Sequence, residues 1–268
     1  MNQPKNLVEQ INAMSSDDIS KFILECMGLR VEKLEEPGDR KEADFLAYYE
    51  SEIFIIEAKL KVDDEKELSR RERVLTQGEV YVKDDVLGRD NTVSGALSNA
   101  RDQLISSAKV HRHDLRIIFH LSKGINVKAK YEKTTDPLLG RTNIIDMTTQ
   151  KYKPCYFFRY SDFYKFRHAF DAAIVGYVDG HFELHANLYA NPHSPRYEKT
   201  KKSKFLARYK CKDPMVEEAQ GRAYIPDANI SIRESEEVLN HLRIKYKNAM
   251  LEQIDFFAPE ITIRVANE

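Results

Sequence analysis

The feature that most constrains this chain is residues 53–60, IFIIEAKL, in which two charged residues follow four apolar ones. In a β-strand, alternate side chains point to opposite faces. Glu57 and Lys59 would therefore share one face with Ile53 and Ile55, and the residues between them would form a second apolar face. A strand that is apolar on both faces is typical of the centre of a sheet covered by helices.

The neighbouring segments predict the other elements of such a layered domain. Residues 17–28 and 92–109 carry apolar or small residues at helical spacing. Residues 43–49, 52–60 and 115–122 are rich in β-forming residues and predict strands. This order of elements predicts an α/β fold with a central mixed sheet flanked by helices.

Beyond residue 150 the sequence is harder to interpret. We expect a helix over 163–178, a strand over 181–190, and a long helix with a closing strand over 234–265. The predicted domains are a core over 1–175, with a highly charged insertion at about 61–90, and a C-terminal α+β extension over 176–268. That extension is either separate or packed on the core as one domain.

Composition excludes some classes of function. Hydrophobic residues make up 42% of the chain and the formal net charge is −1, so a nucleic acid would need a local basic patch. Cys26, Cys155 and Cys211 are widely spaced and odd in number, which favours free thiols in a reducing compartment. No apolar run approaches the ~18 residues of a membrane span, and no signal peptide is recognisable, so we expect a cytoplasmic protein without membrane contact.

Charged side chains at the end of a buried strand need an explanation. Asp44 poses the same problem one strand earlier, where it lies between Ala43 and Phe45. Burying a lone charge costs several kcal/mol unless it is paired or binds a metal. One interpretation is an ion pair between Glu57 and Lys59 at the end of the sheet, with Asp44 in water. The other is a shared metal-dependent site.

The spacing of Asp44 and Glu57-Ala58-Lys59 resembles that of the PD-(D/E)xK nuclease superfamily, which has the restriction-endonuclease-like fold. In that family a helix precedes a β-meander, an acid begins the second strand, and a Glu-x-Lys lies on the third. A glutamine on a following helix often faces the site, and Gln103 would match it.

The resemblance covers residues 17–122 and departs from the family pattern at two points. Ala43 stands where a proline often precedes the acid. Many members also place a glutamate on the first helix, and Glu25, Asp18 and Glu9 are candidates for that position, which stays unassigned.

The resemblance implies a Mg²⁺-dependent nuclease, with Mn²⁺ as a substitute, and it favours DNA over RNA as the substrate. Asp44, Glu57 and the backbone carbonyl of Ala58 would bind the metal, because Mg²⁺ prefers oxygen ligands. Lys59 would position the attacking water, act as a base, or offset phosphate charge. Gln103 would orient the water or Lys59, and a solvent-facing Gln103 is an equally good interpretation. Analogy within the superfamily further favours a role in restriction or anti-phage defence. A helicase or ATPase partner subunit and a homo-oligomer are both compatible with the sequence, which specifies neither.

Two other classes of protein stay open. The first is a catalytically inactive nuclease-fold protein that binds nucleic acid or a protein partner. The second is an unrelated α/β protein in which Glu57 and Lys59 are simply paired. The presence of Asp44 together with both residues favours an active site, since a decayed site usually loses one of the set.

Residues 196–212 hold eight lysines and arginines against one acid. Aromatic residues lie among them, which predicts a nucleic-acid-binding surface with rings that stack on bases. The alternative is a solvated basic loop with its aromatics in the core. The proposed contacts are Arg196, Lys199, Lys201, Lys202, Lys204, Arg208 and Lys210.

Two histidine pairs, His111 with His113 and His181 with His185, could each lie on one strand face. No third ligand can be named from the sequence, so these histidines are not expected to bind metal. The cysteines lack an activating partner, and a catalytic thiol is not expected.

Overall fold

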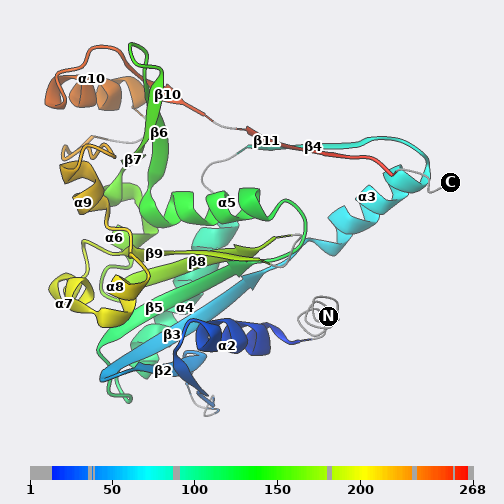
Figure 1. Cartoon of the computed structure of the whole chain (residues 1–268), viewed down its shortest axis with the longest axis vertical. Coiled ribbons are helices and arrows are strands. Elements are labelled where there is room, and N and C mark those ends of the chain that lie inside the picture. The colour runs from blue at the N-terminus through cyan, green and yellow to red at the C-terminus, as the bar shows by residue number, and fades with distance from the viewer. Residues whose placement is uncertain are drawn as a thin grey trace.

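The computed structural model describes residues 14–35, 38, 40–86, 91–179, 183–230, 234–255 and 257–264. Its centre is a mixed sheet of six strands in the order β1-β2-β3-β5-β8-β9 (Figure 1). The strands are β1 (Arg30–Lys33), β2 (Phe45–Tyr49), β3 (Glu52–Lys61), β5 (Leu115–Ser122), β8 (Ala172–Val178) and β9 (Leu184–Ala190).

The strand directions divide this sheet into two parts. β1, β2 and β3 form an antiparallel meander, whereas β3, β5 and β8 run parallel to one another, and β9 is antiparallel to β8. The parallel pairing of β3 with β5 requires a crossover connection, and part of it is helix α4 (Asn91–Ser107). The predicted α/β architecture with a mixed central sheet flanked by helices is confirmed.

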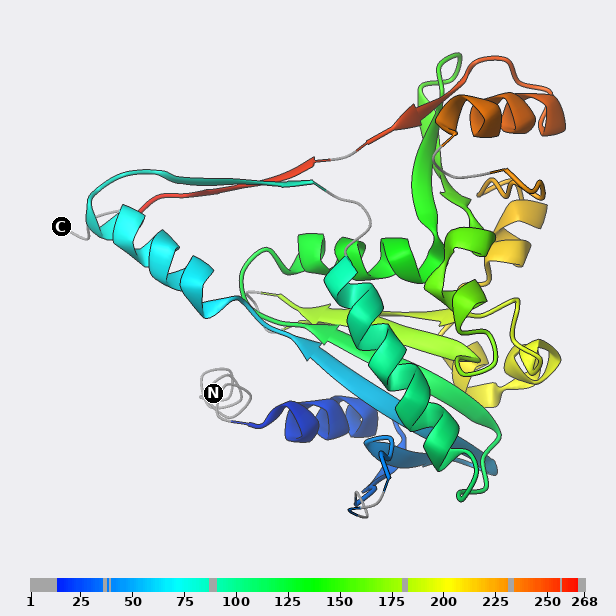
Figure 2. The same cartoon turned by 180° about the vertical axis from the view of Figure 1, so that it is seen from behind.

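Helices cover both faces of the sheet, as Figures 1 and 2 show. On one face α2 (Ser16–Cys26) packs its apolar stripe against Phe54 and Ile56 of β3. On the other face α4 packs against Ile55, and α5 (Val127–Leu139) completes that layer. The alternation expected along β3 is therefore observed, and the two apolar faces belong to two separate cores.

The helix expected over 163–178 is wrong. The chain forms a short turn η1 (Phe158–Tyr160), the short helix α6 (Asp162–Lys165), and then the central strand β8. The segment AAIVGYV is a continuous apolar run, and such a run fits a buried strand as well as a buried helix. Its β-branched residues and Tyr177 were the local signals for a strand.

The expected domain boundary between residues 175 and 176 falls inside β8. β8 and β9 belong to the central sheet, and α8 (Lys204–Arg208), which follows α7 (Tyr197–Lys202), buries Phe205 in the core beneath α2. The second half of the expected extension instead joins residues from the expected core to form a lobe with its own apolar cluster. That lobe contains β6 (Arg141–Asp146), β7 (Lys151–Tyr156), β10 (Leu251–Ile254), α9 (Pro214–Ala219) and α10 (Ser235–Lys245).

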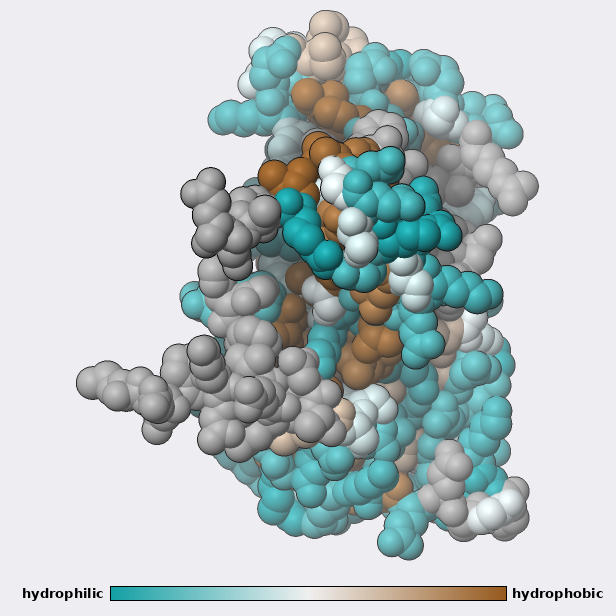
Figure 3. All heavy atoms as spheres, turned by 90° about the vertical axis from the view of Figure 1, so that its right-hand side faces the viewer, coloured by the Kyte–Doolittle hydropathy of each residue, from teal (hydrophilic) through white to brown (hydrophobic). Residues whose placement is uncertain are grey.

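The charged insertion forms most of an arm that projects from the end of β3 (Figure 1). It contains α3 (Glu65–Thr76) and β4 (Tyr81–Val86), and β4 pairs with the closing strand β11 (Phe257–Thr262). Arg71 and Glu260 lie 3.3 Å apart and join α3 to β11. Figure 3 views the free end of this arm and shows apolar surface among mostly hydrophilic residues.

A buried ion pair joins β5 to the start of β8. Asp171 is fully buried, and its carboxylate accepts hydrogen bonds from Arg116 Nε and Nη2, each at 3.1 Å. We expect Asp171→Ala to lower the free energy of unfolding by about 3 kcal/mol, because it leaves the Arg116 charge buried without its partner. Urea unfolding measures this loss. An Arg116→Met/Asp171→Leu double variant should lose less, and an equal loss in both would contradict the role of the charge.

No helix within the described residues is both long and apolar enough to cross a membrane. The three cysteines are free thiols, with Cys26 exposed, Cys155 buried and Cys211 half-buried. Burial raises the pKa of Cys155 well above its usual value and that of Cys211 to about 12, so neither is activated as a nucleophile.

Candidate active site

The register of β2 and β3 brings Asp44 beside Glu57. The last residue pair of this ladder is Phe45 with Ile56, so Asp44 and Glu57 follow directly as the next pair. The carboxylate of Asp44 accepts a hydrogen bond from the backbone N–H of Ala58, at 2.7 Å from Oδ2. The acid of one strand is thereby fixed against the Glu-x-Lys of the next.

Glu57 is fully buried and only partly paired. Its Oε1 accepts a hydrogen bond from Lys59 Nζ, whereas Oε2 has no hydrogen-bond partner among the described residues. Burial, and to a smaller extent the nearby charge of Asp44, raise the pKa of Glu57 to about 8 against the opposing effect of Lys59. The pKa of Asp44 is also raised, first by burial. Both carboxylates thus have pKa values above their ordinary range, which is common where carboxylates share a functional site.

Gln103 connects α4 to both strands. Lys59 Nζ lies 3.4 Å from Gln103 Oε1, and Gln103 Nε2 donates to the backbone carbonyl of Glu42 at 3.1 Å. One turn later on the same helix, Ser107 Oγ accepts a hydrogen bond from the N–H of Ala43 at 2.7 Å. The structure therefore brings Asp44, Glu57, Lys59 and Gln103 together, and Gln103 faces this cluster instead of solvent.

The acid that α2 presents toward the cluster is Asp17. Its negative charge contributes to the raised pKa of Asp44, and Lys33 lies 2.7 Å from Asp17 Oδ2 and lowers the pKa of Asp17 by hydrogen bonding. Asp18, one of the acids named from the sequence, accepts a hydrogen bond from the Ser15 hydroxyl at the start of the helix. Glu25 pairs with Lys21, 3.9 Å away on the same helix, and Glu9 lies outside the described residues.

His120 is a second residue that sequence reasoning missed. It lies opposite Lys59 in the parallel ladder of β3 and β5 and is almost fully buried. Burial lowers its pKa to about 4, with further contributions from the positive charges of Lys61 and Lys59, so it is neutral at pH 7. The alternation in LRIIFHLS shows which residues of β5 share a face with His120. Only the register of β3 with β5 shows that this is the face that carries Lys59.

The basic segment lies at the opposite end of β3. Glu52, at the start of the strand, accepts backbone hydrogen bonds from Lys204 at 3.1 Å and from Phe205 at 3.0 Å. Glu57 lies five residues after Glu52, which corresponds to about 17 Å along a strand. A nucleic acid bound at the segment would therefore have to extend that far to reach the acidic cluster.

Four of the eight cations in this segment have acidic partners. Lys199 lies 2.6 Å from Asp114, Lys201 lies 2.6 Å from Glu198, and Lys204 lies 2.6 Å from Glu50. Arg196 lies 3.8 Å from Asp171, and Arg208 Nη1 lies 3.3 Å from the hydroxyl of Tyr49. Lys202 and Lys210 are exposed.

The aromatic residues of this segment take part in the fold. Phe205 is fully buried, and the hydroxyl of Tyr209 donates to the carbonyl of Met27 at 2.6 Å. Phe205 therefore cannot stack on a base, and that part of the prediction is wrong. The alternative, basic residues with aromatics in the core, describes this corner better.

The histidine pairs behave differently from one another. His113 Nδ1 lies 2.9 Å from the carbonyl of His111, and His111 lies 3.5 Å from Glu42, which is a local hydrogen-bonded arrangement. His181 lies outside the described residues. His185, for which no third ligand was expected, lies with Asp179 and Glu183 in a group whose ligand atoms are within 4.8 Å of one another.

Comparisons of the chain with protein-family models, with curated proteins and with solved structures each gave no match.

Proposed function

We propose that the chain is a Mg²⁺-dependent nuclease that hydrolyses phosphodiester bonds, with DNA as the preferred substrate. The observation that supports this most directly is the convergence of Asp44, Glu57 and Lys59 at one end of a buried strand. Glu57 is fully buried there, and one of its oxygens has no hydrogen-bond partner among the residues that the structure describes. The restriction-endonuclease-like core belongs to the same proposal, and the order of a helix, a three-stranded meander, a helix and a parallel strand is compatible with it.

The donor atoms of the site suit a hard divalent cation. Glu57 Oε2 has no hydrogen-bond partner in the part of the chain that the structure describes, and the Asp44 carboxylate has a second oxygen beyond the one held by Ala58. The N–H and C=O of one strand residue point to the same side, so the Ala58 carbonyl faces the side on which the β2 ladder has already ended. Asp44, Glu57 and the Ala58 carbonyl would hold Mg²⁺, which prefers oxygen ligands. The bound ion would polarise the phosphate and lower the pKa of a coordinated water.

Lys59 and Gln103 would position the reacting groups and stabilise the charge that develops during the reaction. Lys59 is held between the oxygens of Glu57 and Gln103, which aims its ammonium group into the cluster. In that position it would orient the attacking water and offset the negative charge that develops on the phosphate. Gln103, tied to the Glu42 carbonyl, would keep the Lys59 side chain in place while substrate binds.

The test is cleavage of supercoiled plasmid, single-stranded DNA and RNA with Mg²⁺, Mn²⁺ or EDTA. We expect metal-dependent DNA cleavage that falls by at least about a hundredfold in Asp44→Asn, because even groups that only support metal ligands contribute 10- to 100-fold. The matched control is Asp102→Asn on the same helix as Gln103, where the carboxylate is exposed and pairs with Arg101. The proposal would be contradicted if the wild-type chain cleaved none of the three substrates. Cleavage that survives Asp44→Asn would also contradict it. DNA retained in a gel shift without cleavage would point to the inactive binding protein.

A further inference from the structure

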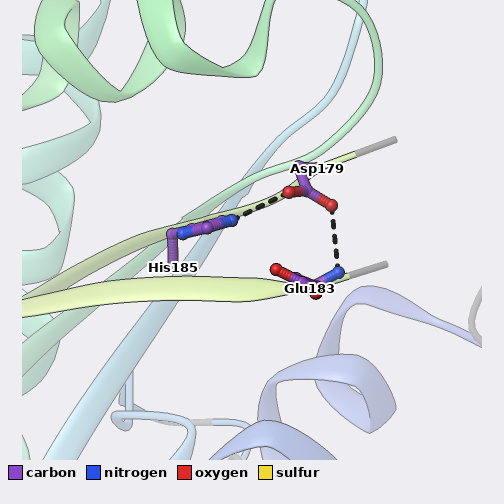
Figure 4. A group of neighbouring side chains, drawn as sticks. All are labelled: Asp179, Glu183 and His185. Atoms are coloured by element: carbon purple, nitrogen blue, oxygen red, sulfur yellow. Dashed lines mark hydrogen bonds and ion pairs between the residues drawn. The ribbon is translucent and has the colours of Figure 1, made fainter. Parts of the chain in front are cut away.

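A second group of metal-ligand side chains lies at the end of the β8–β9 hairpin, on strands different from those of the candidate active site. Asp179, Glu183 and His185 point toward one another there (Figure 4). His185 Nε2 lies 2.8 Å from Asp179 Oδ2, and the backbone N–H of Glu183 donates to Asp179 Oδ1 at 3.0 Å. One imidazole and two carboxylates thus lie close together.

The group contains two carboxylates and one imidazole. The carboxylate of Glu183 is exposed and forms no hydrogen bond or ion pair with the described residues. Within the same residues, this is the one group in which three His, Cys, Asp or Glu ligand atoms lie within 4.8 Å of one another. Two carboxylates beside one imidazole would be drawn together by a divalent cation, which offsets both charges at once.

The ring of His185 is held in place. It stacks on Tyr177, its cross-strand neighbour, with ring centroids 4.7 Å apart and planes inclined by 19°. A cavity of about 450 Å³ adjoins it and is lined by residues that include Tyr131, Tyr177 and Asn187. Glu183 is exposed, so water molecules can reach the group and complete the coordination of an ion held by three protein ligands.

We propose that Asp179, Glu183 and His185 bind a divalent transition metal of the Zn²⁺ class, with water in the remaining positions. The imidazole nitrogen favours Zn²⁺ over Mg²⁺, which takes oxygen ligands. The metal would replace the hydrogen bond between His185 and Asp179 and join both strands of the hairpin across its turn. The site is independent of the proposed nuclease activity, because none of its ligands lies on β2, β3 or α4.

The test is calorimetric titration of the full chain with ZnCl₂ in the presence of millimolar Mg²⁺. We compare wild type with His185→Ala and Asp179→Asn. Asn at 179 can still accept the N–H of Glu183, so the turn is kept while the ligand charge is lost. The matched control is His241→Ala, since His241 lies 2.9 Å from Asp227 in a similar His–Asp pair and belongs to no such group of three.

We expect the wild type and His241→Ala to bind one more equivalent of Zn²⁺ than His185→Ala and Asp179→Asn, whatever other sites the chain contains. Zn²⁺ should also raise the Tm of the first two proteins above that of the latter two. Equal stoichiometry in all four proteins would overturn the proposal and assign the bound Zn²⁺ to other sites. Because the readout is Zn²⁺ stoichiometry, absence of nuclease activity would not affect it.

Discussion

Replacing Lys59 by methionine is expected to reduce metal-dependent DNA cleavage by about a thousandfold while the chain stays folded. Methionine keeps the length of the side chain but removes the charge that Glu57 and Gln103 hold in place. Groups that transfer protons or stabilise developing charge contribute ~10² to 10⁴ in rate. The Lys59 side chain is 28% exposed, so methionine can be accommodated at the edge of the cluster.

Lys61→Met is the matched control for this experiment. Lys61 lies on the same strand and the same face, two residues further on, and removing its charge changes the net charge by the same amount. We expect Lys61→Met to keep its cleavage rate within about tenfold of wild type. A similar loss in both variants would mean that the positive potential of the strand matters and that Lys59 has no specific role. Circular dichroism and the midpoint of urea unfolding should show that both variants are folded.

The sequence predicted the part of the site that depends on local alternation. Glu57 and Lys59 are two residues apart on a strand, so any pairing of that strand leaves them on one face. Asp44 could be placed beside them because a short polar link joins its strand to β3, and such a link favours an antiparallel hairpin. The sequence did not predict Asp17 or His120 near the cluster, because their positions depend on how α2 crosses the sheet and on the register of β3 with β5.

Pairings between residues far apart in the chain account for the errors in domain organisation. β4 and β11 pair across more than 170 residues, and β10 joins β6 across about one hundred. No local pattern specifies such partners. The proposed boundary failed for the same reason, since a glycine within an apolar run indicates a linker or a central strand equally well, and only the pairing of Gly176 with Ala186 decides.

Glu57→Gln is expected to stabilise the fold by about 3 kcal/mol near pH 7 in the absence of metal. The buried carboxyl has its pKa raised to about 8 from an ordinary value of 4.5, so between these values the folded state binds a proton that the unfolded state has released. Stability of the wild type therefore falls as pH rises from about 4.5 through 8, by up to about 5 kcal/mol in total. Glutamine resembles the protonated carboxyl and does not titrate, which removes this loss, and Lys59 can still reach water.

Urea unfolding at several pH values in EDTA tests this expectation. The two proteins should differ by less than about 1 kcal/mol at pH 5, where the unfolded form of Glu57 also begins to hold the proton that the folded form already binds, and the difference should grow toward pH 8. Asp102→Asn should show no such dependence. If Glu57→Gln were instead less stable at pH 8, the Glu57–Lys59 ion pair would be the stabilising element, and the interpretation as a simple structural pair would be favoured.

Metal binding should restore the folding stability that is lost when the buried Glu57 ionises, and it should do so only in the wild type. A divalent cation that binds the ionised Glu57 stabilises the folded state by about 2.7 kcal/mol at one hundred times its Kd. The gain should increase from pH 6 to pH 8, because Glu57 must lose its proton to bind the ion. In Glu57→Gln the added Mg²⁺ should have little effect at any pH. If the cluster is a functional metal site, it should lower the stability of the chain without metal and raise it when metal binds. A structural ion pair between Glu57 and Lys59 would stabilise the chain in both conditions.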